Sequence, residues 1–245
     1  MVEYERPLGY SMPLAHGLYP PPPYHYQKMR SMVALFQTDI ETKRKFLPKD
    51  FEPMNLFDAI FIVEYPNSSI GPYNENLILL SCTYKNKPGL FTSNIYVDSD
   101  IALAAGRELW GYPKKMCQIE LSEVQDNKIV GSLTRMGVKF LEVESEVGKL
   151  APGMDIKGLI GTLPIYNVKQ IPNIDGSQNP ALRQITETVL GIGEVYTNLG
   201  CKTNYIKSKF SEHDLCHELV NDAKKDLGGF YIIADMTLPP GKVLE

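Results

Sequence analysis

Two adjacent lysines, Lys114 and Lys115, end the stretch GRELWGYPKK at residues 106–115. A neutral lysine amine can attack a ketone and form an imine, a covalent intermediate that accepts the electrons of a breaking carbon–carbon bond. Free lysine has a pKa of about 10.4 and is a cation at neutral pH, so this chemistry requires surroundings that disfavour the charge. The alternative is a solvated pair of surface lysines, and the neighbouring residues decide between the two.

The elements around the two lysines place them at a corner of the chain. Residues 100–105, which are small and apolar after the first, predict a short helix that Ser99 or Asp100 can cap. The Gly-Tyr-Pro segment at 111–113 ends this helix, because glycine frees the backbone and proline removes a hydrogen-bond donor. Residues 116–121 then indicate a strand. A lysine fixed at such a corner can be directed into a cavity.

An extended chain after Pro113 separates the two lysines, because successive side chains of a strand point to opposite faces. Lys114 and Lys115 are then poor electrostatic partners, and loss of water from Lys114 is the larger effect expected to disfavour its charge. The same alternation puts Met116 and Gln118 on the face of Lys114, where Gln118 can hydrogen-bond a substrate oxygen. Ordinary packing of the strand is the alternative for both.

The segment GRELxxYPKK resembles the Schiff-base lysine segment of the acetoacetate decarboxylase family. Further blocks resemble that family in the same order along the chain, among them SMPL at 11–14, IPNIDGS at 171–177 and IADMTLP at 233–239. Several blocks in the right order are more specific than any single block. The resemblance implies that Lys114 is the lysine that forms the imine.

The resemblance also assigns other residues to the site. Lys115 joins Lys114 in the catalytic group, and Tyr112 matches a family tyrosine whose ring walls the pocket. Glu75, in the sequence YNEN at 73–76, matches a Tyr-x-Glu of the family. A carboxylate there can stabilise the imine cation or move protons, whereas a lone glutamate in a loop is otherwise simply solvated.

Two positions depart from the family pattern. The family's decarboxylases carry an arginine that is thought to bind the substrate carboxylate, and an ungapped alignment places Met29 there, next to Arg30. The family's first glutamate aligns with Ile60, although a short gap brings Glu64 into register. Arg30 and Glu64 are therefore candidates for substrate binding, and the substrate class is left open.

Composition and charge exclude several classes of partner. The net charge of −4 gives no electrostatic reason to expect nucleic acid or an anionic membrane as a partner. No stretch approaches the roughly 20 apolar residues of a membrane helix, and the start of the chain does not resemble a signal peptide. The four cysteines form no Cys-x-x-Cys pair, so reduced thiols in a cytoplasmic protein are expected, without a metal site.

From Ala59 onward the chain is composed mainly of short apolar runs joined by turn residues, which predicts an antiparallel barrel or sandwich. The family resemblance implies the more specific fold, a closed antiparallel β-barrel with a few peripheral helices. Residues 66–76 are expected to form a loop, and residues 211–227 one long helix. Residues 1–245 are interpreted as a single domain.

Residues 1–26 are rich in proline and tyrosine, which favours an extended arm. The arm is expected to pack on the body of the protein or on another subunit, and the family resemblance implies a homo-oligomer. A recognition peptide is the alternative.

These features support one main hypothesis for function and two alternatives. The main hypothesis is a Schiff-base decarboxylase that converts acetoacetate or a larger β-keto acid to a ketone and CO2, with no metal or organic cofactor. The first alternative is a Schiff-base aldolase or dehydratase that acts on a keto acid. The second is a non-catalytic barrel that binds a small apolar ligand. Release of CO2 separates the first two, and a covalent adduct separates both from the third.

Overall fold

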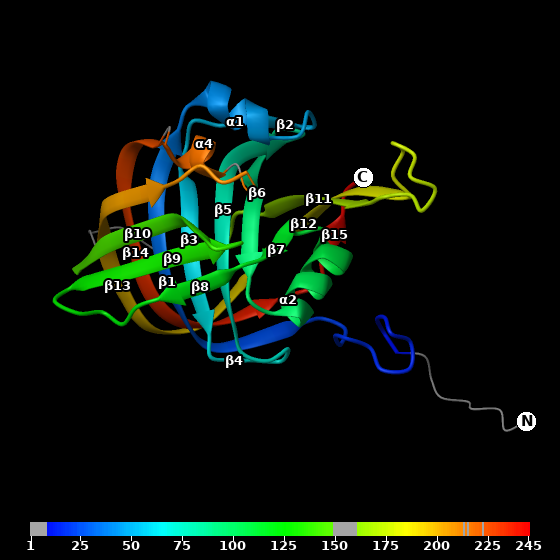
Figure 1. The fold of residues 1–245 in the computed structure, drawn as a ribbon, viewed down its shortest axis with the longest axis horizontal. Coiled ribbons are helices and arrows are strands. Elements are labelled where there is room, and N and C mark those ends of the chain that lie inside the picture. Colours follow the sequence, from blue (N-terminus) through cyan, green and yellow to red (C-terminus); the bar gives the residue numbers. More distant parts are fainter. Residues whose placement is uncertain (1–8, 149–160, 213, 215, 222) are drawn as a thin grey trace, which may run out of the picture.

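The computed structural model describes residues 9–148 and 161–245, apart from 213, 215 and 222. Strands dominate this part of the chain and join into one large sheet, which confirms the prediction of a mainly β protein (Figure 1). The strands are β1 (Tyr24–Thr38), β2 (Phe51–Pro53), β3 (Asp58–Tyr65), β4 (Asn67–Ser68), β5 (Tyr73–Tyr84), β6 (Lys87–Val97), β7 (Lys114–Met116), β8 (Gln118–Leu121), β9 (Lys128–Arg135), β10 (Val138–Gly148), β11 (Ile165–Ile171), β12 (Leu182–Thr188), β13 (Gly191–Ser208), β14 (Ala223–Leu238) and β15 (Lys242–Val243). The helices are α1 (Ile40–Phe46), α2 (Asp100–Ala105), α4 (Cys216–Asn221) and a π-helical turn, η1 (Gly106–Trp110).

The sheet is open in the described part of the chain, so the prediction of a closed barrel is wrong. Hydrogen-bonded neighbours run in the order β15-β12-β11-β6-β5-β3-β1-β14-β13-β10-β9-β8, and the two end strands do not pair. Most pairs are antiparallel, but β6 pairs in parallel with both β7 and β11. Side chains instead connect β8 to the middle of the sheet. Arg30 on β1 donates to the carbonyl oxygens of Leu121, at 3.0 Å, and Ser122, at 2.6 Å.

Two apolar cores lie on opposite faces of the central strands β1, β3 and β5. Phe61 and Leu79 belong to the first core, whereas Ile62 and Leu80 belong to the second. Neighbouring residues alternate between the cores because successive strand side chains point to opposite faces. Burial on both faces explains the unbroken apolar run IFIV at residues 60–63. The first core contains the cavity described below.

Helices α1 and α2 begin at side-chain caps, and the cap of α2 was expected from the sequence. The Asp39 side chain accepts a hydrogen bond from the backbone N–H of Glu41 at the start of α1. Ser99 accepts one from the backbone N–H of Ala102 at the start of α2. These bonds satisfy donors that have no partner within the helix.

The long helix predicted over residues 211–227 is not formed by the residues that the structure describes. Only Cys216–Asn221 are helical, and β14 begins at Ala223. The backbone from Ala223 onward pairs with the end of β1, opposite Thr38. Pairing with a neighbouring strand therefore overrides the local helical spacing.

At Gly229 a Cβ atom would lie 1.9 Å from the carbonyl oxygen of Val33, so only glycine lets β14 approach β1 this closely.

A buried ion pair attaches α1 to the sheet. Lys43 Nζ lies 2.8 Å from Asp58 Oδ1, and both side chains are fully buried. The ammonium also donates to Met54 O at 2.6 Å and to Ser81 Oγ at 2.8 Å. Asp58 in turn accepts from the backbone N–H groups of Thr38 and Ser81. Each charge is thus matched by an opposite charge and by further hydrogen bonds.

Replacement of Asp58 by alanine is expected to lower the free energy of unfolding by about 3–5 kcal/mol, because the Lys43 ammonium loses its counter-charge while still buried. Glu52→Ala is the matched control, since Glu52 pairs with Arg44 on the surface and such exposed pairs contribute about 0–1 kcal/mol. Urea unfolding of both variants measures the difference. Equal losses in the two variants would contradict a special role for the buried pair.

All four cysteines are free and buried. Burial raises the pKa of Cys82, Cys117, Cys201 and Cys216 to about 12 in each case. The reactive thiolate is therefore nearly absent at pH 8 in the folded protein. Two consequences follow, one for labelling and one for stability.

Iodoacetamide at pH 8 is expected to modify the native protein about 10³-fold more slowly than free cysteine, whose pKa is about 8.5. All four thiols should react after unfolding in urea, as counted by intact mass.

Because the pKa of each thiol is raised in the folded protein, the thiols also contribute fully to stability below about pH 8.5, and this contribution is lost as the pH rises towards about 12. Rapid native labelling of any thiol would contradict this description.

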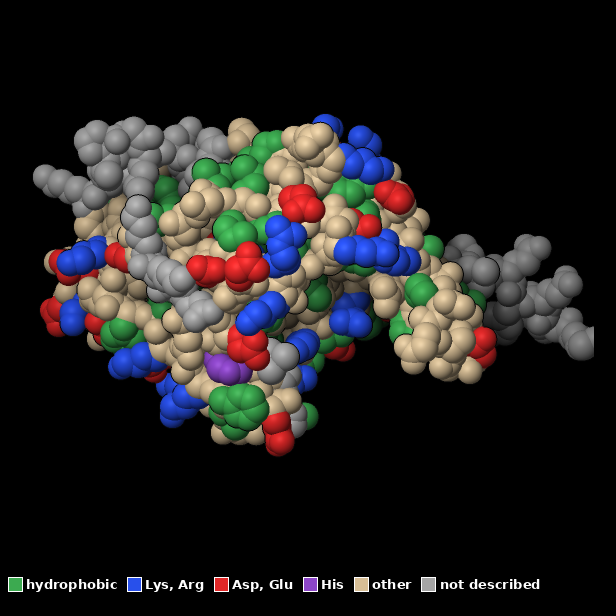
Figure 2. Space-filling view, turned by 90° about the horizontal axis from the view of Figure 1, so that it is seen from above, with side chains coloured by type: hydrophobic (Ala, Val, Ile, Leu, Met, Phe, Trp, Pro, Cys, Tyr) green, Lys and Arg blue, Asp and Glu red, His purple; other side chains and the backbone are tan. Residues whose placement is uncertain are grey.

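The surface is mixed in charge, and part of the proline-rich arm contacts the body. In the face seen in Figure 2, acidic and basic side chains are interspersed over most of the molecule.

Tyr19 in the arm is buried and donates a hydrogen bond to Glu108 of η1. The Tyr24 ring lies edge-on to Trp110, with 5.4 Å between the ring centroids. No helix of the described residues is long and apolar enough to cross a bilayer.

Candidate active site

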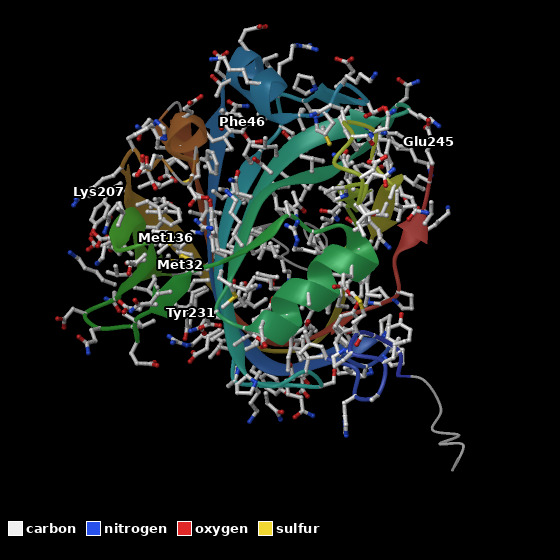
Figure 3. All side chains as sticks on the ribbon, turned by 45° about the vertical axis from the view of Figure 1, so that its right-hand side comes forward. Met32, Phe46, Met136, Lys207, Tyr231 and Glu245 are labelled. Carbon is white, nitrogen blue, oxygen red and sulfur yellow. The ribbon has the colours of Figure 1, made fainter. Side chains whose placement is uncertain are left out.

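The chain turns sharply between α2 and β7, as the sequence indicated. Helix α2 continues into the π-helical turn η1, which closes when the Tyr112 N–H donates to Gly106 O at 3.0 Å. Gly111 then takes a left-handed conformation, with φ of 78°, and a Cβ there would lie about 2.5 Å from the backbone of Lys169. Glycine is therefore required at 111 for two reasons. Figure 3 shows this helical segment lying across the strands of the sheet.

Lys114 is the first residue after this corner, and its side chain is buried. Only 5% of the side chain is exposed, and Nζ donates to Glu75 Oε2 at 2.7 Å. The ammonium also lies 5.7 Å from the centroid of the Tyr73 ring and 5.8 Å from that of Tyr112. A carboxylate and two aromatic faces thus replace the water that burial removes.

Glycine at position 106 makes room for this lysine. A Cβ atom at Gly106 would lie 2.6 Å from both Cδ and Cε of Lys114. The aliphatic part of the lysine therefore runs directly over the backbone of η1. This contact fixes the direction in which Lys114 enters the cavity.

Gly106→Ala is expected to lower kcat by about 10²-fold, because a displacement of the reacting group by about 1 Å costs that much. The melting temperature should change little, since the new methyl group meets the flexible end of a side chain. Steady-state kinetics and thermal unfolding of the same preparation measure the two effects. Gly148→Ala is the control, because a Cβ atom there would meet nothing within 4 Å and Gly148 does not have a positive φ. Wild-type kcat in Gly106→Ala would show that the contact does not position the lysine.

Glu75 lies in a strand rather than in the predicted loop, because β5 begins at Tyr73. Its backbone pairs with Val63 of β3, and its side chain is 8% exposed. The Tyr65 hydroxyl donates to Glu75 Oε1 at 3.3 Å. One oxygen of the carboxylate therefore contacts Lys114 and the other contacts a tyrosine.

A cluster of tyrosines surrounds the ion pair. The hydroxyls of Tyr26 and Tyr73 lie 3.1 Å apart and share one hydrogen bond. Burial, and secondly the charge of Glu75, raise the pKa of Tyr26, Tyr65, Tyr73 and Tyr112 above the ordinary value. These hydroxyls are therefore neutral hydrogen-bond donors at neutral pH.

The ion pair and the tyrosines line one cavity in the first core. Within the described part of the chain, Lys114 is its sole cationic residue and Glu75 its sole carboxylate. Apart from this lysine, this glutamate, the tyrosines and Ser31, the lining residues are apolar. The cavity is formed by Tyr26, Met29, Ser31, Phe61, Val63, Tyr65, Tyr73, Glu75, Leu77, Leu79, Ile95, Tyr112, Lys114, Ile165, Leu190, Ile192, Ile232, Met236 and Leu238.

The structure separates the two lysines, as the strand alternation predicted. Lys115 Nζ lies 2.6 Å from Asp214 Oδ1 and does not line the cavity. Asp214 is fully buried, accepts a hydrogen bond from the Tyr96 hydroxyl at 2.9 Å and lies 3.6 Å from Arg135. Lys115 thus pairs with a carboxylate away from the cavity, whereas Tyr112, assigned with it, does line the cavity.

Met116 and Gln118 do not line the cavity, so the expectation that this face of the strand meets the substrate beyond Lys114 is wrong. Met116 is 45% exposed, and Gln118 is exposed with its amide donating to Glu120. The strand is interrupted at Cys117, whose N–H donates to Val97 O. Cys117 and Ile119 both belong to the second core, so the alternation continues through the interruption, but beyond Lys114 the other face is exposed to solvent.

Arg30 and Glu64 also lie outside the cavity. Arg30 Nε donates to Glu64 Oε2 at 2.8 Å, and the pair adjoins β8. Met29 faces the cavity instead, and on β3 the inward positions next to Glu64 are Val63 and Tyr65. The described part of the cavity therefore contains no guanidinium to bind a substrate carboxylate.

Several lining residues were missed from the sequence. Tyr73 could have been found, because it lies two residues before Glu75 on one strand and therefore faces the same side. Tyr26 could not, because β1 carries a bulge between Tyr26 and Met29, with Lys28 at a φ of 50°. The bulge lets an even-numbered and an odd-numbered residue both face inward.

Metal binding finds no support in the described residues, among which no group of three or more His, Cys, Asp or Glu side chains could hold an ion. Lysine, carboxylate and phenol groups are the reactive groups of the cavity. This set suits covalent chemistry on a carbonyl carbon, with proton transfers by the carboxylate.

Comparison with known proteins points to one family. A family model described as acetoacetate decarboxylase matches residues 11–245. The chain is 27% identical over 246 residues to an acetoacetate decarboxylase of Ralstonia nicotianae, covering 99% of this chain and 97% of the relative. Every residue that lines the cavity falls inside both matches.

Solved structures give the same result for the fold. An acetoacetate decarboxylase of Legionella pneumophila superposes with a TM-score of 0.84 at 26% identity, covering 96% of this chain and 93% of that chain. The enduracididine biosynthesis enzyme MppR superposes with a TM-score of 0.83 at 18% identity, covering 100% of this chain and 97% of that chain. The second likeness concerns the fold alone.

Proposed function

Because the chain belongs to the acetoacetate decarboxylase family, we propose that it is a Schiff-base decarboxylase that converts acetoacetate or a related β-keto acid to a ketone and CO2. The observation that supports this proposal most is the contact of 2.7 Å between the buried Lys114 amine and Glu75. A nucleophile and a proton acceptor thus lie within hydrogen-bonding distance, in a cavity of otherwise low polarity.

Formation of the imine begins when the neutral amine of Lys114 attacks the ketone carbon of the substrate. Glu75 Oε2 accepts the proton that the lysine must lose. The carboxyl group then returns this proton to the hydroxyl of the carbinolamine, which leaves as water and yields the iminium. Tyr65, donating to Glu75 Oε1, keeps the carboxylate oriented towards the lysine.

The iminium then takes up the electron pair of the bond that breaks. The bond between the α-carbon and the carboxylate breaks, CO2 leaves, and the electron pair forms an enamine. A proton added at the α-carbon restores an iminium, which water hydrolyses to the ketone and free Lys114. This proton comes from solvent water, through a tyrosine hydroxyl beside the lysine, because Glu75 has already given its proton to the departing water.

Release of CO2 and ketone from acetoacetate and longer β-keto acids tests the proposal. The purified protein is expected to form acetone from acetoacetate faster than the spontaneous reaction in buffer. Lys114→Ala serves as the control for any contaminating activity. If every β-keto acid released CO2 no faster with the protein than in buffer alone, the proposed decarboxylase activity would be overturned.

A Schiff-base aldolase or dehydratase acting on a keto acid is the second candidate. The described lining allows it, because the arginine that the family's decarboxylases are thought to use for the substrate carboxylate has no counterpart there. MppR, which shares the fold, has been crystallised with pyruvate and with the condensation product of pyruvate and imidazole 4-carboxaldehyde. An imine adduct with pyruvate and a condensed product, without CO2, would support this candidate over the decarboxylase.

We also infer a homo-oligomer in the cytoplasm. Tyr10, Met12 and Leu14 in the arm are 54%, 68% and 54% exposed in the single chain, and a second subunit can cover them. Four free thiols suit a reducing compartment. Sedimentation equilibrium is expected to give a multiple of the mass of one chain, and a monomer would contradict the assembly.

A further inference from the structure

The strand register arranges the cavity in levels along β5. Tyr73, Glu75, Leu77 and Leu79 face inward at every second position and pair across to Tyr65, Val63, Phe61 and Ala59 of β3, in that order. A strand rises about 3.3 Å per residue, so about 13 Å separates the level of Glu75 from that of Leu79. The reacting lysine lies at the level of Glu75 and therefore divides the cavity into two parts.

One part of the cavity, at the level of Tyr26 and Tyr73, adds neutral hydrogen-bond donors to an apolar lining that includes Ile192 and Met236. Tyr26 and Tyr73 share a single hydrogen bond, so one of the two hydroxyls keeps a hydrogen for another acceptor. A substrate carboxylate at this end would be bound by hydroxyls instead of by a cation. Such weak solvation disfavours the charged carboxylate relative to the neutral CO2 that leaves.

Ser31 adds an independent indication of a ligand. It pairs with Val63, at the level of Glu75, and lines the cavity with only 2% of its surface exposed. Its hydroxyl has no hydrogen-bond partner in the structure. A buried hydroxyl without a partner is costly, and a bound oxygen atom at the level of the reacting lysine would satisfy it.

The other part of the cavity is apolar throughout. Beyond Glu75 towards Leu79, the lining residues are Phe61, Leu77, Ile95 and Ile165. Ile165 pairs with Leu90, which pairs with Ser81, so it lies at the far end of this part. None of these residues can hydrogen-bond a ligand through its side chain, so this part suits hydrocarbon.

We propose that the substrate is a 3-oxo acid with an apolar chain of several carbons beyond the ketone, in preference to acetoacetate. The ketone carbon bonds to Lys114, the carboxylate lies on the hydroxyls of Ser31 and the Tyr26–Tyr73 pair, and the chain extends towards Leu79. This inference rests on the proposed decarboxylase function. A 3-oxo acid carries its carboxylate and its chain on opposite sides of the ketone, which matches the two parts of the cavity.

A series of 3-oxobutanoate, 3-oxohexanoate and 3-oxooctanoate tests the inference through kcat/KM for CO2 release. Each methylene buried in the apolar part is expected to raise kcat/KM about fourfold, equivalent to about 0.8 kcal/mol, until the cavity is full. Leu79→Ala should move the optimum to longer chains. Leu80→Ala is the matched control, because Leu80 is the adjacent leucine, equally buried, and faces the other core. It should leave the ranking of the substrates unchanged.

The outcomes separate the inference from the function on which it rests. CO2 release that is fastest with 3-oxobutanoate would overturn the chain-length preference and leave the decarboxylase intact. Equal shifts in Leu79→Ala and Leu80→Ala would also overturn it, because a general loosening would then explain the change. No CO2 from any member would overturn both, and borohydride trapping on Lys114 would show whether imine formation or decarboxylation had failed.

Discussion

Replacing Lys114 by alanine is expected to lower kcat/KM for the best substrate by roughly 10⁴-fold or more, as loss of a covalent nucleophile does in other enzymes. The substitution removes the atom that bonds to the substrate, and no other lysine lines the described cavity. It also removes the positive partner of the buried Glu75 carboxylate, so the melting temperature should be measured on the same preparation. Rates are then compared only where the variant is folded.

Lys115→Ala is the matched control, because it removes the same side chain one residue later. Lys115 pairs with Asp214 and lies outside the cavity. This variant should lose stability, since the buried Asp214 carboxylate loses its shortest ion pair, yet it should retain the imine adduct and most of the catalytic rate. A loss of rate as large as that of Lys114→Ala would mean that the two lysines act together and would contradict their separation.

Glu75→Gln is the second substitution with a large expected effect, a fall in kcat of about 10²–10⁴-fold. Glutamine preserves the shape of the side chain and can hydrogen-bond Lys114, but it cannot accept the proton that the amine must lose. The slow step should then be formation of the imine, visible in single-turnover experiments as slow accumulation of adduct. If Glu75 had only a structural role, the substitution would lower the melting temperature without slowing formation of the adduct in the folded protein.

Glu64→Gln provides the comparison for Glu75. Glu64 lies on the neighbouring strand, level with Asn74, but its side chain is 41% exposed and pairs with Arg30. Its removal should leave imine formation and turnover within about twofold of wild type, given that exposed pairs contribute only about 0–1 kcal/mol. The Glu75→Asp variant retains a carboxylate, so a kcat higher than that of Glu75→Gln would further separate proton transfer from packing. Wild-type turnover in Glu75→Gln would remove Glu75 from the mechanism.

The buried position of Lys114 could be predicted because its determinants lie in one contiguous stretch. Pro113 and Gly111 mark the corner, and the residue after the proline becomes the buried lysine. The cap at Ser99 could also be predicted, since capping depends on a side chain and a backbone donor only a few residues away.

The rest of the site depends on register, which local sequence does not determine. A bulge at Lys28 brings both Tyr26 and Met29 into the cavity and turns Arg30 away from it. Gln118 keeps the alternation of Lys114 but lies where that face is exposed, because the strand has passed the cavity. A bulge moves every following side chain to the other face, so an error of one residue exchanges a lining residue for an exposed one.

The prediction of a closed barrel was wrong for a related reason. Strand number and alternation can be read from apolar runs, but closure requires that the two end strands meet. Here β15 has two residues and β8 has four, and the Arg30 side chain occupies the place where β8 approaches the middle of the sheet. The predicted helix after Ser211 failed because the chain from Ala223 pairs with β1.

Borohydride reduction in the presence of acetoacetate or 3-oxooctanoate, read by intact mass and peptide mapping, tests the central claim most directly. The expected result is one reduced adduct for each chain, located on Lys114 and missing from Lys114→Ala but present in Lys115→Ala. No adduct with any keto acid, while the protein remains folded and binds apolar ligands, would contradict imine chemistry and favour a non-catalytic binding protein.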